Sequence, residues 1–158
     1  MKFSAFFLVL MCLFSCEEKK TNSLPSFDLT LLKTKTIFNT NNIPKGKPFI
    51  IMYFSPDCEH CQQETVDLIH HIKEVASINF YMITNDPIER LNVYNDYYKI
   101  YKYNNIILTR DHTYFFLNTY KPKYTPYIAI FDKSRELKVV YDGGAQIDTI
   151  IQVIKQYS

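Results

Sequence analysis

The chain has 158 residues, of which 47% are hydrophobic and 22% are charged, and its formal net charge at pH 7 is +2. This length and apolar content allow one domain with a substantial core and exclude a disordered chain. The nearly balanced charge gives no basis for a nucleic-acid partner, and we expect none.

Residues 1–15 have the pattern of a secretory signal peptide. Lys2 supplies a positive start, and residues 3–14 form an apolar run that is too short to span a bilayer stably as a helix. The run ends in Leu-Phe-Ser followed by Cys16, which resembles the bacterial lipobox, where the cysteine is lipidated and becomes the first mature residue. We expect Cys16 to carry the lipid anchor. The alternative is an ordinary secretory signal or an uncleaved anchor with an incidental cysteine.

The four cysteines fall into two groups. Cys12 lies within the predicted signal peptide, and Cys16 would be blocked by lipid. Cys58 and Cys61 then remain as the free thiols of the mature chain, so no framework of structural disulfides is expected. A single close pair suits a dithiol that cycles between two states without forming wrong bridges.

Residues 16–25 are polar and are predicted to form a tether, with one domain over residues 26–158. Apolar runs and alternation predict strands over residues 27–32, 36–38, 49–54, 78–84, 105–109, 127–131 and 137–141. Apolar stripes of helical spacing predict helices over residues 59–76, 86–101 and 146–156, and residues 111–120 read as a short helix or a loop. The pattern predicts a three-layer α/β domain with a mixed sheet.

The pattern Cys58-Glu59-His60-Cys61 lies where a buried strand gives way to a helix. The first cysteine would meet the free N–H groups of the helix N-terminus, where the macrodipole favours a thiolate. The second lies three residues on, along the same side of the helix, close enough to form a disulfide with the first. This spacing therefore predicts a redox-active dithiol.

Three segments in this order resemble the thioredoxin superfamily, and within it the membrane-tethered TlpA-like thiol-disulfide oxidoreductases. They are Gly-Lys-Pro at residues 46–48, Phe-Ser-Pro-Asp-Cys-Glu-His-Cys-Gln-Gln-Glu at residues 54–64, and Thr125-Pro126. The resemblance covers about residues 26–156. It implies a thioredoxin-like α/β/α fold with a mixed central sheet, to which the first two strands add an N-terminal β-hairpin.

The resemblance implies a role for each residue of the motif. Cys58 would be the exposed nucleophile that attacks a partner disulfide, and Cys61 the buried thiol that resolves the mixed disulfide. Pro126, with a cis peptide bond, would place the Thr125 backbone against the dithiol and offer an edge to the substrate chain. The alternative for Pro126 is a trans proline in an ordinary turn.

Glu64 follows the second cysteine by three residues. In cytochrome-maturation enzymes of the resembling group, a glutamate there lies near the dithiol and assists its protonation. A carboxylate one turn beyond Cys61 could shuttle its proton or raise a thiol pKa, and the alternative is a solvated helix glutamate. His60 would contact substrate and stabilise a thiolate at Cys58, whereas its acidic neighbours would oppose that effect.

Two departures from thioredoxin itself affect the expected chemistry. The position of its buried aspartate, six residues before the first cysteine, is Met52 here, and the position of its tryptophan, just before that cysteine, is Asp57. A general base at the first position is therefore absent.

The expected function is that of a lipid-anchored thiol-disulfide oxidoreductase of the cell envelope that needs no added cofactor. It would exchange disulfides with client proteins, as a reductant supplied by a membrane electron donor. Cytochrome c maturation is one such task.

Three alternatives remain. A copper chaperone would use the dithiol with a histidine, but His70 and His71 lie about 13 Å along the helix from Cys61, and His112 could approach only from a loop. A peroxiredoxin-like peroxidase would need a lone cysteine beside Thr and Arg. A binding lipoprotein without catalysis would retain the scaffold alone.

Overall fold

The computed structural model describes residues 22–157. The predicted signal peptide and Cys16 lie outside the described residues. Of the segment predicted as a tether, residues 22–25 are described and pack on the domain. Ser23 forms an antiparallel bridge with Glu136, and the Leu24 N–H donates to the Arg135 carbonyl over 3.0 Å. Leu24 is buried, so the domain holds the chain from this residue onward.

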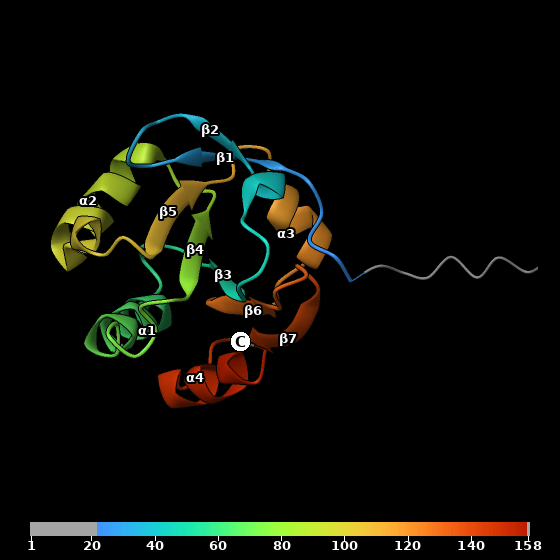
Figure 1. The fold of residues 1–158 in the computed structure, drawn as a ribbon. Coiled ribbons are helices and arrows are strands. Elements are labelled where there is room, and N and C mark those ends of the chain that lie inside the picture. The colour runs from blue at the N-terminus through green and yellow to red at the C-terminus, as the bar shows by residue number, and fades with distance from the viewer. Residues whose placement is uncertain (1–21, 158) are drawn as a thin grey trace, which may run out of the picture.

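A seven-stranded mixed sheet forms the centre of the described part of the chain (Figure 1). Its strands are β1 (Asp28–Leu31), β2 (Ile37–Asn39), β3 (Phe49–Tyr53), β4 (Asn79–Thr84), β5 (Ile106–Arg110), β6 (Tyr127–Phe131) and β7 (Leu137–Asp142). Their order is β2-β1-β5-β4-β3-β6-β7. Strands β3, β4 and β5 run parallel, and the other pairings are antiparallel. The predicted mixed sheet and the N-terminal hairpin, β1–β2, are confirmed.

Helices cover both faces of this sheet (Figure 1). They are α1 (Glu59–His70), α2 (Ile88–Tyr98), α3 (Phe115–Tyr120) and α4 (Ile147–Lys155), with 3-10 helices η1 (Thr40–Asn42) and η2 (Ile100–Lys102). Buried residues of α1, α2 and α4 join one core cluster, and a buried residue of α3 joins the other. The predicted three-layer architecture is therefore confirmed.

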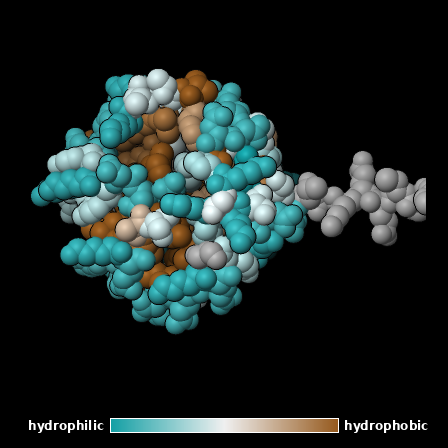
Figure 2. Space-filling model, viewed as in Figure 1, coloured by the Kyte–Doolittle hydropathy of each residue, from teal (hydrophilic) through white to brown (hydrophobic). Residues whose placement is uncertain are grey.

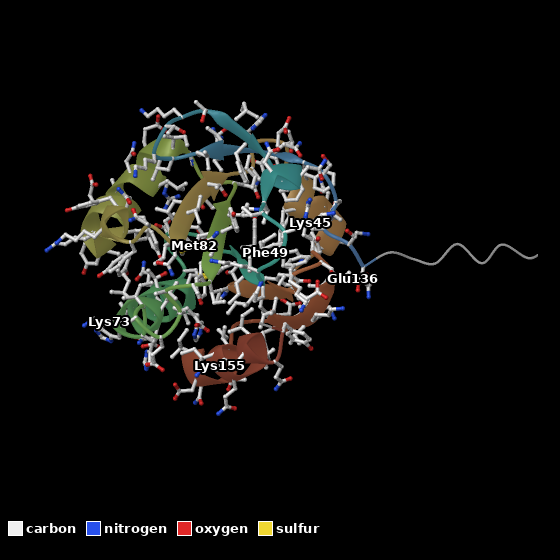
Figure 3. All side chains as sticks on the ribbon, viewed as in Figure 1. Lys45, Phe49, Lys73, Met82, Glu136 and Lys155 are labelled. Atoms are coloured by element: carbon white, nitrogen blue, oxygen red, sulfur yellow. The ribbon has the colours of Figure 1, made fainter. Side chains whose placement is uncertain are left out.

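Alternation along the inner strands divides the core into two. In β3, Ile50 and Met52 face the core beneath α1, α2 and α4, whereas Phe49 and Ile51 face the opposite core. Because both faces are covered, the strand reads as a continuous apolar run in the sequence. Figure 3 shows Phe49 and Met82 carrying their side chains into the interior from neighbouring strands.

Polar side chains dominate the face drawn in Figure 2, with apolar ones showing over β5 beside α2. Lys45, Lys73 and Lys155 are exposed to solvent, and Figure 3 shows Lys73 at the edge of the molecule. Within residues 22–157, no helix has the length and apolar character needed to cross a membrane.

Two helices are shorter than predicted. Helix α1 ends at His70, six residues before the expected end, and the chain continues in turns to Ser77. Hydrogen bonds of the tighter three-residue spacing follow, such as that from the Glu74 N–H to the His71 carbonyl over 2.9 Å. The apolar spacing nevertheless continues through the buried Val75, because packing on the sheet does not require a regular helix.

The second of these helices, α2, starts at Ile88 and stops at Tyr98, where Lys99 takes the left-handed conformation with φ 54°. Three more residues then follow as η2. Asp86 does not bond the helix N-terminus with its side chain; instead its carboxylate accepts from the hydroxyls of Ser55 and Thr84.

The sheet register brings together the parts of the chain that carry the predicted site. Tyr53, the last residue of β3, lies opposite Tyr127, the first residue of the antiparallel β6. The segment after β3 therefore meets the segment before β6, which places Cys58 beside Thr125.

Candidate active site

Cys58 occupies the N-cap position of α1. Its backbone is extended (φ −78°, ψ 114°), and its sulfur accepts a hydrogen bond from the Cys61 N–H over 3.2 Å. A serine, threonine or aspartate oxygen does the same work at an ordinary helix start, so a cysteine there directs its sulfur at unsatisfied N–H groups. The positive end of the helix dipole favours negative charge on that sulfur.

The surroundings of Cys58 lower its pKa. Partial burial opposes this shift, but hydrogen bonds from Cys61 and from Thr125 outweigh it. The Thr125 hydroxyl lies 3.4 Å from the sulfur and can donate to it. The thiol, when protonated, can donate to the Thr125 carbonyl, also over 3.4 Å. The thiolate of Cys58 is therefore favoured relative to that of an ordinary cysteine.

The pKa of Cys61 is shifted in the opposite direction to that of Cys58. Its side chain is fully buried on the sheet-facing side of α1, and burial, with the neighbouring Cys58, raises the pKa of its thiol to about 12. Both cysteines are free thiols in this structure. The pair thus consists of a partly exposed sulfur that favours the thiolate and a buried sulfur that stays protonated.

Thr125 and Pro126 form the second wall of the site, and the peptide bond between them is cis, as predicted. The loop is fixed to the end of β7. The Asp142 carboxylate accepts from the N–H groups of Lys123 and Tyr124, and the Gly143 N–H donates to the Pro126 carbonyl over 3.0 Å.

Glu64 is a partly buried carboxyl, not a fully solvated helix residue. Its Oε1 accepts from the Ala145 N–H over 2.8 Å. Burial raises the pKa of Glu64, and nearby Asp67 adds to the rise, although the bond from Ala145 opposes it. The carboxyl is therefore protonated at a higher pH than an ordinary glutamate.

Gly144 lies between the Glu64 carboxyl and the Pro126 ring, close to both. The sequence analysis did not identify this glycine as part of the site. A Cβ at this glycine would lie 2.7 Å from the Glu64 Oε1 and 3.1 Å from the Pro126 Cγ, and its φ is +93°. The sequence has a Gly-Gly pair at residues 143–144, but such a pair by itself indicates only a turn after the strand predicted over residues 137–141.

His60 lies between the cysteines and is exposed. The residue before the dithiol, Asp57, forms an ion pair with Arg90 of α2, and Arg90 also pairs with Asp86 over 3.2 Å. Met52, in the position of thioredoxin's buried aspartate, is buried in the core.

The hydroxyls of Thr65 and Tyr94 hydrogen-bond the backbone carbonyl of Cys61. The Thr65 hydroxyl donates to the Cys61 carbonyl over 2.9 Å, and the Tyr94 hydroxyl lies 2.6 Å from that of Thr65 and 3.3 Å from the same carbonyl. Both residues are buried. Sequence reasoning did not identify this pair, because its two residues are 29 positions apart.

Within the described residues, no group of three or more histidine, cysteine, aspartate or glutamate side chains is placed to hold a metal ion.

Neither a family model nor a curated protein matches this sequence. Solved structures do match the fold. DsbF from MTB aligns with a TM-score of 0.71 at 16% identity, over 84% of this chain and 95% of its own. This chain has a thioredoxin fold. The confirmed fold places Cys58 and Cys61 where the thioredoxin resemblance expects a dithiol.

Two further structures with the thioredoxin fold have different descriptions. The exposed lipoprotein thioredoxin Etrx1 from Streptococcus pneumoniae aligns with a TM-score of 0.66 at 21% identity, over 84% of this chain and 99% of its own. A peroxiredoxin-like protein from Aquifex aeolicus aligns with a TM-score of 0.71 at 12% identity, over 87% of this chain and 86% of its own. The thioredoxin fold alone therefore does not select the reaction.

Proposed function

We propose that this protein is a thiol-disulfide oxidoreductase of the cell envelope that reduces disulfides in client proteins. The observation that carries the proposal is the asymmetry of the dithiol. Cys58 is partly exposed with a lowered pKa, whereas Cys61 is buried with a pKa raised to about 12. Disulfide exchange needs one thiolate that attacks and one protected thiol that acts second.

In the first step, the Cys58 thiolate attacks one sulfur of a client disulfide. A bond forms between Cys58 and that sulfur, the client S–S bond breaks, and the second client sulfur leaves as a thiolate. In the second step, Cys61 loses its proton and attacks the Cys58 sulfur, which releases the first client sulfur. The first client sulfur also leaves as a thiolate. The client gains two electrons, and Cys58 and Cys61 are oxidised to a disulfide. The two client thiolates then take up two protons: one equals the proton that Cys61 released, and the other comes from solvent, because Cys58 reacts already deprotonated.

Glu64 is the proposed acceptor of the Cys61 proton. It lies one helical turn beyond Cys61, and its raised pKa makes it a stronger base than a solvated glutamate. Thr125, Pro126 and His60 are the proposed contacts for the client backbone around the reacting disulfide. Thr125 already touches the Cys58 sulfur through its hydroxyl and its carbonyl.

The location and partners of the protein form part of the proposal. A lipid anchor at Cys16 would hold the domain on the extracytoplasmic side of a membrane, where disulfides form and persist. The described structure of an exposed lipoprotein thioredoxin with the same fold supports this assignment. A membrane electron donor would return the dithiol to its reduced state, and apocytochrome c is one candidate client.

Single-cysteine variants test the reaction. Cys58→Ser is expected to abolish reduction of insulin disulfides. Cys61→Ser is expected to accumulate mixed disulfides with client proteins, which reducing agent releases. Full activity in both variants would overturn the proposal. Peroxide consumption that persists in Cys61→Ser, without disulfide reduction in the parent protein, would favour a peroxidase instead.

Metabolic labelling with a fatty acid tests the anchor. The wild-type chain is expected to incorporate the label and to partition into detergent, and Cys16→Ala to do neither. Cys12→Ala is the matched control, because Cys12 lies in the predicted signal peptide. Equal labelling of the wild type and Cys16→Ala would contradict the anchor without affecting the proposed reaction.

A further inference from the structure

A groove of about 440 Å³ lies between the loop before Cys58 and helix α2. Its apolar and aromatic lining consists of Pro56, Val93, Tyr94, Tyr97 and Tyr98. The proposed exchange reaction does not use any of these side chains.

Two of the lining side chains are exposed to an unusual degree. Val93 is 71% exposed and Tyr97 is 76% exposed. Because they are four residues apart in α2, they lie on the same face of the helix. Isolated apolar residues on a surface are normal, but adjacent ones that line a hollow indicate a surface that binds a partner.

The floor of the groove is buried and contacts the backbone of the dithiol. Tyr94 is only 4% exposed, and its ring packs against Phe54 and Tyr98. Its hydroxyl approaches the Cys61 carbonyl at 3.3 Å. One wall of the groove adjoins the reacting cysteine, because Asp57 lines the groove and directly precedes Cys58.

The charge around the groove is negative. Arg90, which lines it, is shared between the carboxylates of Asp57 and Asp86. Glu89 and Asp96 are exposed on α2 next to Val93, on the side away from Tyr94 and Tyr98, so they flank the groove and do not line it. A partner that fits this surface therefore carries an apolar side chain beside a basic one, and an acidic side chain would be repelled.

We propose that this groove docks client proteins through a segment in which a large apolar residue and a basic residue lie beside the reacting cysteine. The proposal rests on the disulfide reductase function. When a client cysteine is bonded to Cys58, the residues next to it in the client lie at the mouth of the groove. The reason is that Asp57 lines the groove and is also the neighbour of Cys58 in the chain. The groove thus selects among disulfides that are equally reactive in themselves.

Synthetic peptides with one cysteine, bound as a mixed disulfide to glutathione, provide the test. The peptides differ only beside the cysteine and carry Phe-Lys, Ser-Lys or Phe-Glu. The full chain in detergent reduces each peptide, and kcat/KM is compared with that for oxidised glutathione, which is too small to span the groove. The wild type is expected to prefer Phe-Lys by about tenfold over each of the others.

Two sets of substitutions assign the preference to the groove. Val93→Ser with Tyr97→Ser is expected to abolish the preference for Phe over Ser. Glu89→Gln with Asp96→Asn is expected to reduce the preference for Lys over Glu. Ile37→Ser is the matched control, because Ile37 is 60% exposed on β2, outside the groove, and it should leave both preferences intact.

Unchanged preferences in the groove variants, or equal rates of the wild type on all three peptides, would overturn the docking site while leaving the reductase function in place. A wild-type protein that reduces neither the peptides nor oxidised glutathione would overturn the reductase function, and the docking site with it.

Discussion

The two sulfurs of the site differ because one caps a helix and the other is buried behind it. The Cys58 sulfur accepts from the Cys61 N–H, and the Thr125 hydroxyl lies within reach. Cys61 has no comparable access to water. The surroundings of each sulfur change the pKa of that thiol, so the difference between the two thiols can be tested by changing one residue at a time.

We expect the Cys58 thiol to titrate below the pH of an ordinary cysteine. In a Cys61→Ser background, the rate of alkylation by iodoacetamide should level off at a lower pH than for a cysteine in a short peptide. Thr125→Val removes the hydroxyl donor, so it should raise the pKa of Cys58 and slow alkylation at neutral pH several-fold. Thr36→Val, in the exposed β1–β2 turn, is the control. An unchanged titration in Thr125→Val would show that the hydroxyl does not stabilise the thiolate.

The raised pKa of Glu64 makes the stability of the fold depend on pH. Burial causes the rise, so the folded state disfavours the ionised carboxylate. This contribution favours folding below the pKa of the unfolded chain and is lost as the pH rises through the folded pKa. Glu64→Gln, whose amide oxygen can still accept from Ala145, should therefore unfold at a higher temperature than the wild type near pH 8, with the gain shrinking toward pH 4.

The same substitution should slow the reaction if Glu64 accepts the Cys61 proton. A general base typically contributes 10²–10⁴-fold, so a fall of at least about tenfold in disulfide reduction is expected. Glu74→Gln removes a charge from the exposed turn after α1 and should leave the rate unchanged. A wild-type rate in Glu64→Gln would rule out the proton-acceptor role.

The sequence singled out Cys58 and Cys61 by their spacing, and the thioredoxin resemblance pointed to Glu64 and Thr125-Pro126. Neither identified Gly144 or the ion pair of Asp57 with Arg90, because those contacts join segments far apart in the chain. Glu64 and Ala145, for example, are 81 residues apart. The packing of α4 against α1 brings them together.

At the scale of elements, the strands were predicted more closely than the helix ends. The run at residues 49–54 could be read as a buried strand because both faces of β3 are covered. The end of α1 could not be predicted from the sequence, because the apolar stripe continues to the buried Val75 after the regular helix has stopped. An apolar spacing reports which residues face the core and not which hydrogen bonds the backbone makes.

The turn between β7 and α4 holds two elements of the site in register. Gly144→Ala would place a Cβ 2.7 Å from the Glu64 carboxyl and 3.1 Å from the Pro126 ring. We expect it to destabilise the fold and to slow disulfide reduction by an order of magnitude or more, since a misplacement of about 1 Å can cost 10²-fold. Chemical denaturation and steady-state kinetics measure the two effects.

Gly46→Ala separates contact from backbone strain. Gly46 has a similar φ of +90° but no atom within 4 Å of its would-be Cβ. The Gly46→Ala variant should lose only about 1–3 kcal/mol of folding stability, which is the cost of a non-glycine residue in the left-handed conformation. Its rate of disulfide reduction should equal that of the wild type. Equal kinetic losses in both variants would show that Gly144 does not position Glu64 or Pro126.

At the scale of the whole molecule, Asn22, where the described part of the chain begins, and the dithiol lie at opposite ends of the sheet. The Asn22 carbonyl accepts from the Leu137 N–H at the start of β7, whereas Cys58 lies beside the start of β6. Because these strands are antiparallel, the two ends are separated by roughly 17 Å of strand. A lipid at Cys16, at most ~22 Å of chain from Asn22, would direct the dithiol away from the membrane.

In vesicles carrying the full chain, Cys58 should react with a membrane-impermeant maleimide as fast as it does in detergent. Lys133→Cys, in a Cys58→Ser and Cys61→Ser background, places a thiol in the exposed β6–β7 turn, where the Arg135 carbonyl accepts from the Leu24 N–H. The bilayer should slow the reaction of this thiol with the maleimide. Protection of Cys58 instead would mean that the dithiol faces the membrane surface.

The equilibrium reduction potential of the Cys58–Cys61 pair, measured with the full chain in glutathione or dithiothreitol buffers, is the most direct test of the proposed reductase. We expect one two-electron transition, closer to the value of about −270 mV for thioredoxin than to about −120 mV for DsbA. A potential near that of DsbA would make the protein an oxidant of its clients. Failure to form the disulfide in any buffer would contradict disulfide exchange altogether.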